Sequence, residues 1–403
     1  MVSQDASSIL KGVVVVDLTR YVSGSYATML LSSLGATVIK VEPPQVGDPY
    51  RGQGTASVAG ESALFVGLNT GKRSLAINIK SSDGREILER LIARADIFAE
   101  NARPGSLSVL GLDYETLSLR YPSLVYLSVS AYGVEGPRAD KGGFDLTLQA
   151  ASGLMSVTGT EGGEPMKVGV PVLDIGSAVC GVLGTLAALI GRQSSAQGSH
   201  VTSSLFEFGL ASLSSVATTI SITGDVPQPL GSHSPSFAPY GAFRTKSGYV
   251  VLAGAGNESL WQKLCGAVDR QDLVSDERFL TNADRVLHRD ALTNELEAAL
   301  AQDTAETWVR RLEDCGVPAE LVSSVTDVLK SADVSALGML QTLALAGEPY
   351  PCVAPPFSVG ERPQYSVAAP RLGQHSREVL VDIGVSDLDI ERLVAAGVVG
   401  VES

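Results

Sequence analysis

The sequence has 403 residues, of which 44% are hydrophobic, and its formal net charge is −14. This composition supports a substantial core and excludes a disordered chain, and the acidic balance disfavours nonspecific binding to nucleic acid or to an anionic membrane. The four cysteines show no CxxC spacing, so we expect reduced thiols, no disulfide framework and no metal site. Because no secretory signal pattern is visible at the start, we predict a cytoplasmic protein.

Short apolar runs alternate with amphipathic stretches over the first 130 residues. Helices are predicted at 25–34 and 83–94, because their apolar residues recur at helical spacing. The runs rich in β-branched residues are predicted strands at 13–16, 37–41, 74–78, 95–99 and 124–130. This alternation predicts an α/β fold with a Rossmann-like large domain and a mainly parallel sheet. Such sheets bind ligands beyond the carboxyl ends of their strands.

The pattern becomes mostly helical after residue 145, with the clearest predicted helices at 178–192 and 202–222. A segment dense in Pro, Ser and Gly at 224–239 predicts a domain boundary. The smaller domain that follows is predicted to be α+β, with its strand and helices at 249–253, 260–268, 291–301 and 305–315.

A Pro-rich segment at 350–370 is predicted to be a linker that leads back to two closing helices. We therefore expect a large domain that contains the site at 1–223 and a small domain with flanking linkers at 224–345. A C-terminal segment at 346–403 would return to the large domain.

Charge is unevenly distributed along the chain. The first 105 residues carry 11 basic and 10 acidic side chains, whereas the remainder is strongly acidic. An anionic ligand would therefore be tolerated best in the N-terminal part, although acidic helices elsewhere would produce the same contrast.

Several common catalytic patterns are missing from the sequence. Residues 67–73, GLNTGKR, resemble a phosphate loop but lack the Ser or Thr that should follow Lys72 and hold magnesium. No GxGxxG follows the first predicted strand, which disfavours a nicotinamide or flavin site. No histidines pair at helical spacing and no GxSxG elbow is present. A metal centre is therefore disfavoured, and Ser-His-Asp catalysis stays open only as a minor alternative, since triads assemble across a fold.

One carboxylate, Asp174, stands alone after a Gly-rich connection and before a helix of small residues. An Asp at such a place is most simply a helix N-cap, because its oxygen can accept hydrogen bonds from the free amides of the first turn. The same arrangement could also present one acid to a ligand. The local residues leave both interpretations open.

Many ordered segments resemble the class III CoA-transferases, a family that also includes the α-methylacyl-CoA racemases. The likeness extends from about residue 12 to about residue 380. Distinctive segments are VVVVDLTRYVSG at 13–24, LGATVIKVEPPQVGDPYR at 34–51, GFDLTLQAASGLMSVTG at 143–159 and VPVLDIGSAVCGVLGTLAAL at 170–189.

The resemblance implies that Asp174 is a catalytic nucleophile. Its carboxylate would attack an acyl-CoA thioester and form a mixed anhydride, and then an aspartyl-CoA thioester, without ATP, metal or a tightly bound cofactor. Backbone N–H groups beside glycines near Asp174 are the candidates for stabilising the oxyanion. Coenzyme A and its acyl thioesters are thus expected as substrates, together with a free carboxylic acid.

The resemblance also implies a CoA cleft along the parallel-sheet domain. The implied contacts are Val22, Ser23, Ile77, Asn78, Ile79, Lys80, Asn101, Ala102, Arg103, Lys141, Gly142, Gly143, Phe144 and Asp145. Further candidates for phosphate, with a solvated surface role as the alternative, are Lys40, Lys72 and Arg73. Two departures from the family are Val109 and Pro43, which stand where relatives often carry an Arg for CoA, so phosphate recognition must be redistributed or weaker.

Phe144 stands thirty residues before Asp174, where the racemases carry a His. Because phenylalanine cannot take a proton, we expect a transferase, with a racemase or a non-catalytic acyl-CoA-binding protein as alternatives. Residues 231–238 differ from the Gly-rich lid of the formyl-CoA transferases, which disfavours formyl or oxalyl transfer. Small dicarboxylates are the preferred acids, with Arg20 or Arg51 as the cation for the spare carboxylate. The family fold further implies an interlocked homodimer.

Overall fold

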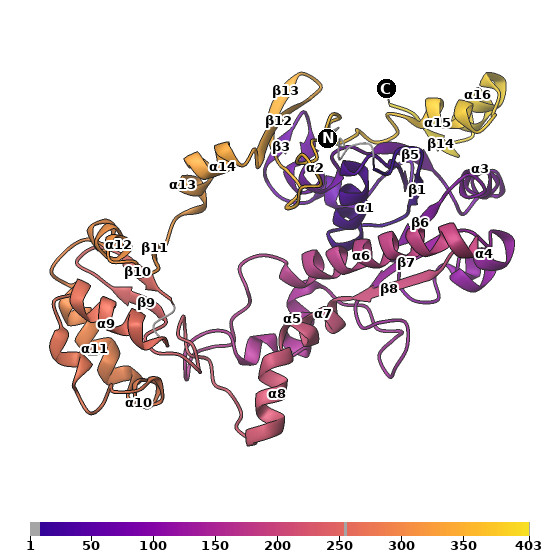
Figure 1. Cartoon of the computed structure of the whole chain (residues 1–403). Helices are drawn as coiled ribbons and strands as arrows, with labels where there is room; N and C mark the ends of the chain where they lie inside the picture. The colour runs from indigo at the N-terminus through magenta and orange to yellow at the C-terminus, as the bar shows by residue number, and fades with distance from the viewer. Residues whose placement is uncertain (1–8, 254–255, 403) are drawn as a thin grey trace. The chain divides into compact units, whose positions relative to one another are not determined.

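The computed structural model describes residues 9–253 and 256–402 (Figure 1). The chain divides into two compact units that interleave along the sequence. The large unit comprises Met1–Ser152, Val168–Leu213 and Ala332–Ser403, and the small unit comprises Gly153–Lys167 and Ser214–Ser331. Each unit is described by itself below.

A seven-stranded sheet forms the centre of the large unit. Its strands are β1 (Val14–Asp17), β2 (Thr37–Glu42), β5 (Arg73–Ile77), β6 (Ile97–Glu100), β7 (Val125–Ser130), β8 (His200–Ser204) and β14 (Val399–Gly400). The order is β14-β5-β2-β1-β6-β7-β8, and every neighbouring pair is parallel except β14 with β5. The predicted α/β fold with a mainly parallel sheet is confirmed. The strand order reverses between β1 and β6, which is where sheets of this kind bind ligands.

Helices cover both faces of this sheet. On one face, α1 (Ser23–Ser33) contacts β1 and β2, and α6 (Val172–Ser195) contacts β7, β8 and α1 (Figure 1). A Cβ added to Gly181 of α6 would come within 3.1 Å of Leu127 on β7, so a small residue lets the helix lie close to the sheet. The other face is covered by α3 (Ser82–Ile92), α4 (Tyr114–Arg120), α15 (Ser376–Asp382) and α16 (Asp387–Ala395), whose apolar side chains share one core with the strands.

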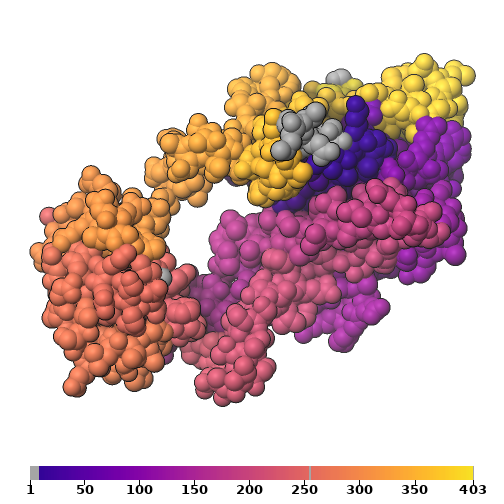
Figure 2. Space-filling view, in the orientation of Figure 1, coloured from indigo at the N-terminus to yellow at the C-terminus, as the bar shows by residue number. Residues whose placement is uncertain are grey.

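The α6 helix is long and apolar enough, by length and composition alone, to cross a membrane. In the large unit it instead packs along the sheet, and its outer side lies at the surface, where its magenta band is visible in Figure 2. The exposed side chains on it include Val179, Leu183 and Ile190.

The large unit also contains several shorter elements. They are η2 (Pro49–Gly52), β3 (Ser57–Val58), β4 (Glu61–Ser62), α2 (Ala63–Asn69), η3 (Ser108–Leu110), α5 (Asp145–Ala151), α7 (Leu205–Ser212), α14 (Ala332–Ala336), β12 (Leu340–Leu345) and β13 (Glu348–Val353). The strands β12 and β13 form an antiparallel hairpin. Tyr350 and Cys352 of this hairpin pack with Met29 and Phe65 in one core cluster. The segment that we predicted as a linker therefore begins as a strand, and residues 332–345 lie with the large unit rather than with the small domain.

The helix predicted at 202–222 is wrong at its beginning. Residues 200–204 form the edge strand β8, which pairs with β7 through Val201 and Thr202, two β-branched residues that favour a strand. The Ser204 side chain then accepts a hydrogen bond from Glu207 N and caps α7. Because short apolar and hydroxyl-rich runs suit both structures, periodicity alone could not separate them.

The small unit combines a three-stranded antiparallel sheet with helices around its own core. Its elements are η4 (Leu154–Ser156), α8 (Ser214–Thr223), β9 (Gly241–Arg244), β10 (Tyr249–Leu252), α9 (Glu258–Ala267), η5 (Gln271–Val274), α10 (Asn282–Leu287), α11 (Arg289–Leu300), α12 (Ala305–Asp314), β11 (Ala319–Leu321) and α13 (Val325–Val328). The predicted strand and the three predicted helices of this region are confirmed, within a few residues at their ends.

Candidate active site

Asp174 lies in the first turn of α6, but it does not cap that helix. The N-cap position is Pro171, which has no side chain that could accept a hydrogen bond. Asp145 takes over this role from α5: its Oδ1 accepts hydrogen bonds from Leu173 N at 2.7 Å and from Asp174 N at 3.3 Å. The interpretation of Asp174 as the N-cap is therefore wrong, and its carboxylate is not occupied by the amides of its own helix.

The surroundings of Asp174 destabilise its charged form. Burial raises the pKa of the Asp174 carboxyl to about 7, and the negative charge of the nearby Asp145 acts in the same direction. A hydrogen bond with the side chain of Ser23, the first residue of α1, opposes this shift of the pKa. A desolvated carboxylate with such a pKa is typical of a catalytic acid, base or nucleophile rather than of a surface aspartate.

Close helix packing fixes the turn that carries Asp174. A Cβ on Gly176 would lie 2.0 Å from the ring of Phe208 on α7, so only glycine allows this ring to pack against the first turn of α6. The first turn of α6 is thereby held between α7, α5 and the sheet, which fixes the position of the Asp174 backbone.

An aromatic trio of Tyr21, Tyr50 and Phe144 lies at the same site. The ring centroid of Tyr21 is 5.5 Å from that of Tyr50 and 5.6 Å from that of Phe144, and both pairs meet edge to face. Burial raises the pKa of the Tyr50 phenol, and the charge of Asp174 raises it further, which places Tyr50 near the carboxylate. We predicted Phe144 as a contact of CoA, whereas Tyr21 and Tyr50 were missed.

The parallel strands bring most of the predicted CoA contacts to one edge of the sheet. Ser23 follows β1, Asn78 follows β5, Asn101 follows β6, and the segment 141–145 follows β7. At the reversal of strand order, the Asn101 side chain accepts a hydrogen bond from Arg20 N at 2.8 Å and donates one to Arg20 O at 2.7 Å. These two bonds tie the loops after β1 and β6 together.

Four exposed cations stand on these loops and form what we call the edge cations: Arg20, Lys80, Arg103 and Lys141. None of them makes an ion pair with another residue in the described part of the chain. A ligand with phosphate groups would therefore meet unpaired positive charge at the carboxyl edge of the sheet.

Two of the predicted phosphate contacts are wrong. Lys40 and Lys72 are fully buried beneath α1. The Lys40 Nζ lies 2.9 Å from Asp48 Oδ2, and the Lys72 Nζ lies 3.0 Å from Asp17 Oδ2. Alternating side chains of β1 and β2 carry Asp17 and Lys40 into the core, and Lys72 enters it directly before β5. Each buried lysine needs a carboxylate partner there.

Arg51 is also occupied, so it cannot serve as the cation for a second carboxylate of the substrate. Its side chain is 7% exposed and pairs with Glu42 at 2.8 Å and with Glu61 at 2.9 Å. Arg73 pairs with Glu378 at 2.6 Å. Of the two arginines proposed for the spare carboxylate, only Arg20 keeps an exposed side chain.

Two more predicted CoA contacts and the predicted oxyanion donors are limited by their surroundings. The side chain of Ile77 lies in the core beneath the sheet, so only its main chain could face a ligand. Asp145, which is 8% exposed, is occupied by the amides of α6 and by the side chain of Gln149. The oxyanion donors expected beside Asp174 are also used, because the N–H groups of Val172, Leu173, Asp174 and Ile175 all have acceptors.

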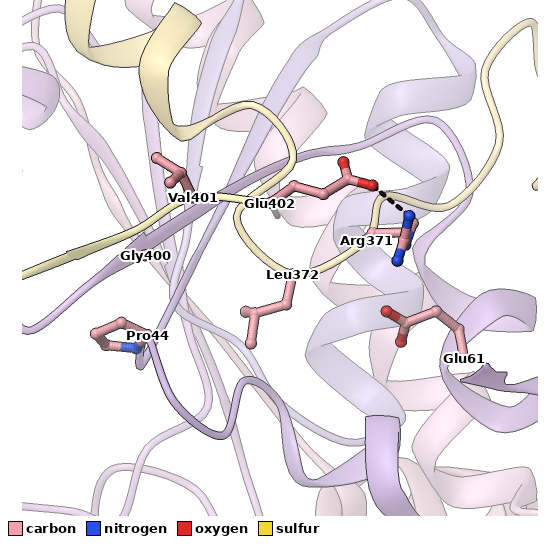
Figure 3. A pocket seen from close by; sticks show the side chains of 7 residues that line it. All are labelled: Pro44, Glu61, Arg371, Leu372, Gly400, Val401 and Glu402. Carbon is pink, nitrogen blue, oxygen red and sulfur yellow. Dashed lines mark ion pairs between the residues drawn. The ribbon is translucent and has the colours of Figure 1, made fainter. Parts of the chain in front are cut away.

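The two departures from the family pattern lie at the surface or beside a small hollow. Val109 is 84% exposed. Pro44, which follows Pro43, lines a hollow of about 210 Å³ together with Glu61, Arg371, Leu372 and residues 400–402 (Figure 3). Arg371 lies 2.6 Å from Glu402 in this hollow. With Glu61 also present, the hollow does not offer an unpaired cation to a phosphate.

The described residues contain no group of three or more His, Cys, Asp or Glu side chains that could hold a metal ion. The site thus consists of a desolvated carboxylate, a hydroxyl, three aromatic rings and exposed cations at the edge of the sheet. This set of groups can bind an anionic ligand and form a covalent bond through a carboxylate oxygen.

Comparison with known proteins identifies the family of the chain. The family model of CoA-transferase family III matches residues 10–376. Among curated proteins, the chain is similar to the succinyl-CoA:glutarate CoA-transferase of Mus musculus, with 35% identity over 98% of this chain and 91% of that protein. It is 34% identical to the succinate–glutarate CoA-transferase of Agrobacterium fabrum, over 93% and 95% of the two chains.

Two further relatives extend the comparison. The acetyl-CoA:oxalate CoA-transferase of Acetobacter aceti is 36% identical over 82% of this chain and 84% of that protein. Among solved structures, a CAIB/BAIF family protein from Brucella suis superposes with a TM-score of 0.83 at 34% identity and covers 93% and 99% of the two chains. The chain belongs to CoA-transferase family III. It is an enzyme that moves CoA between acyl-CoA thioesters and carboxylic acids.

Proposed function

We propose that this enzyme transfers CoA between an acyl-CoA and a small dicarboxylic acid, with Asp174 as the covalent nucleophile. The observation that carries the proposal is the desolvated carboxylate of Asp174, which lies near the Ser23 side chain and is not used as a helix cap. The relatives that act on succinate and glutarate, by their names, support the choice of acid.

The reaction proceeds by exchange of bonds at Asp174. An oxygen of the carboxylate attacks the thioester carbonyl, the carbon–sulfur bond breaks, and CoA leaves as the thiolate, which gives a mixed anhydride. The thiolate then attacks the Asp174 carbonyl, so that the donor acid leaves and an aspartyl-CoA thioester remains. The acceptor carboxylate then attacks the aspartyl-CoA thioester, which releases the CoA thiolate and forms a second mixed anhydride. The thiolate attacks the acceptor's acyl carbonyl in this anhydride, so that the new acyl-CoA leaves and the Asp174 carboxylate is restored.

The start of α1 is the better source of oxyanion donors. The N–H groups of Ser23, Gly24 and Ser25 lie in the first turn of this helix and have no recorded acceptor among the described residues. Because the Ser23 side chain interacts with the Asp174 carboxyl, these amides are the proposed donors to the oxyanion that forms when a carbonyl carbon is attacked there. They replace the amides of α6 that the sequence suggested.

The edge cations support binding of the phosphates of CoA. Lys80, Arg103 and Lys141 are on the loops expected to line the CoA cleft, and Arg20 adds a fourth charge at the reversal of strand order. In this proposal they take over the role of the arginines that Val109 and Pro43 replace in this chain.

We also propose an interlocked homodimer and a cytoplasmic location. The exposed apolar side of α6, with Leu183 at 69% and Ile190 at 68% exposure, supports an association that covers it. Sedimentation should give twice the chain mass of 41.9 kDa, and cell fractionation tests the location. A monomer at micromolar concentration would contradict the dimer.

A panel assay tests the proposed function. The enzyme is incubated with succinyl-CoA and single free acids, and new CoA thioesters are identified by mass spectrometry. We expect new thioesters of short dicarboxylates from the wild type and none from Asp174→Asn, while Asp333→Asn, which removes an exposed charge in α14, behaves like the wild type. Incorporation of deuterium at the α-carbon without any acid acceptor would instead support the racemase.

A further inference from the structure

Tyr21 adopts a backbone conformation that its side chain disfavours. Its φ is +60°, in the left-handed region, where Gly or Asn would be less strained. The residue lies in the loop between β1 and α1, two positions before Ser23, whose side chain interacts with Asp174. Strain of this kind persists when the surrounding structure enforces it, and it is concentrated at functional sites.

A buried ion pair enforces the conformation. Asp48 is 1% exposed, and its Oδ1 accepts hydrogen bonds from Tyr21 N at 3.3 Å and from Tyr50 N at 3.0 Å. Its Oδ2 lies 2.9 Å from the Nζ of Lys40, which also donates to Thr19 O at 2.7 Å. The Asp48 carboxylate therefore fixes the backbone of two residues of the aromatic trio, Tyr21 and Tyr50.

The residue before Tyr21 is fixed as well, because the Asn101 side chain bonds both backbone groups of Arg20. The loop is thus held on both sides of the strained residue. The ring of Tyr21 cannot move aside by a simple shift of the backbone, and its edge-to-face contacts with Tyr50 and Phe144 restrict its own rotation.

The two neighbours of the Tyr21 ring lie near Asp174. Tyr50 is close enough to Asp174 to feel its charge, and Phe144 directly precedes Asp145, which binds the Asp174 amide. The Tyr21 ring contacts the rings of both Tyr50 and Phe144. Phe144 is 65% exposed and Tyr21 is half-buried, so the ring surface is open to a ligand rather than enclosed in the core.

We propose that Tyr21 is a specificity-determining residue, whose ring closes the acyl side of the site and restricts the acid to short, unbranched dicarboxylates. This inference rests on the proposed function, because it assumes that Asp174 carries the acyl group. Glycine would adopt this backbone conformation with less strain if the position served only as a turn. We therefore infer that the Tyr21 ring itself has the functional role.

Substitution of Tyr21 in the full-length enzyme tests the inference. Tyr21→Gly removes the ring and relieves the backbone, and Tyr21→Asn, which also tolerates a positive φ, is a second variant. The acids are succinate, glutarate and phenylsuccinate, which is the bulky probe. We expect the ratio of kcat/KM for phenylsuccinate to that for succinate to rise about tenfold or more in both variants, with no loss of Tm. Tyr21→Phe keeps the ring and should keep the wild-type ratio.

A matched control separates strain relief from the loss of the ring. Ala196, the C-cap of α6, has a φ of +57°, so Ala196→Gly relieves a similar backbone conformation away from the aromatic trio. It should leave the ratio of acids unchanged.

Three results would overturn the inference about Tyr21. They are efficient use of phenylsuccinate by the wild type, an unchanged ratio in both ring-less variants, and an equal loss of kcat/KM for all three acids. Absence of CoA exchange by the wild type with every acid would overturn the proposed function as well. The two failures are therefore distinguishable.

Discussion

The large unit contains two sets of cations that the sequence does not distinguish. One set, Lys40, Lys72 and Arg51, has buried side chains, and each member lies within 3.0 Å of a carboxylate. The other set, the edge cations, is exposed on the loops that follow the parallel strands. The difference teaches that burial beside a carboxylate, rather than charge alone, separates structural cations from those that stay available to a ligand. Lys40 of the buried set stabilises the loop that carries Tyr21 through Thr19 O and Asp48. The edge cations have no carboxylate partner among the described residues.

The largest effect is expected at the nucleophile. Asp174→Asn should lower kcat on the order of 10³-fold or more, because no other carboxylate can form the anhydride there. Its Tm at pH 8 should equal or exceed that of the wild type, since the folded state no longer contains a desolvated charge. Steady-state kinetics and calorimetry measure both. A variant that keeps a tenth of the activity would argue against covalent catalysis by Asp174.

The next largest effect is expected in the buried set. Lys72→Met leaves Asp17 buried without its ion-pair partner and should destabilise the enzyme by about 3–5 kcal/mol in denaturant unfolding. Lys330→Met, which changes an exposed lysine, should alter stability by about 0.5 kcal/mol or less. A small effect of Lys72→Met would mean that Lys72 is not structural, and the comparison of the two sets would fail.

The pH dependence follows from the raised pKa of Asp174. The reactive form is the carboxylate, so kcat/KM should rise with pH and level off above about 7. Because the folded pKa lies above the unfolded value of 3.8, the contribution of this group to stability is greatest when it is protonated and decreases as pH rises from about 4 through 7.

Asp145 contributes to this shift of the pKa by its charge. Asp145→Asn keeps an oxygen that can accept from the α6 amides but removes the charge, so the midpoint of the pH profile should move to lower pH. Two results would contradict the assignment of the raised pKa to Asp174 and its neighbour. They are a pH-profile midpoint near the usual carboxyl pKa in the wild type, and an unchanged midpoint in Asp145→Asn.

The smallest effects are expected in the exposed set. Arg103→Ala should raise KM for acyl-CoA about two- to fivefold, the range that an exposed ion pair of up to about 1 kcal/mol allows, while Tm stays unchanged. The same substitution at Lys330 serves as the control. The difference in KM for acyl-CoA between the wild type and Arg103→Ala should become smaller at high salt, because screening weakens exposed charge pairs. A loss of Tm would place Arg103 in the structural set instead.

The sequence was most informative where a pattern repeats or a motif is local. Alternating runs predicted the parallel sheet, and the family resemblance of the segment around residue 174 predicted Asp174 as the nucleophile. It could not show that Asp145 caps α6 from another helix, because that bond joins residues 28 positions apart. Nor could it show that Lys40 points into the core, although the polar residues at alternate positions of β2 were a signal. The positive φ of Tyr21 has no signature in the residue itself and depends on Asp48, which lies 27 residues away.

The most direct test of the central claim is to trap the covalent intermediate. The enzyme is exposed to succinyl-CoA and then to hydroxylamine, digested, and analysed by mass spectrometry. We predict that the peptide that contains Asp174 carries a hydroxamate on that side chain, and that it does not when acyl-CoA is omitted. A productive enzyme that shows no modification, or shows it on another residue, would contradict the assignment of Asp174 as the nucleophile.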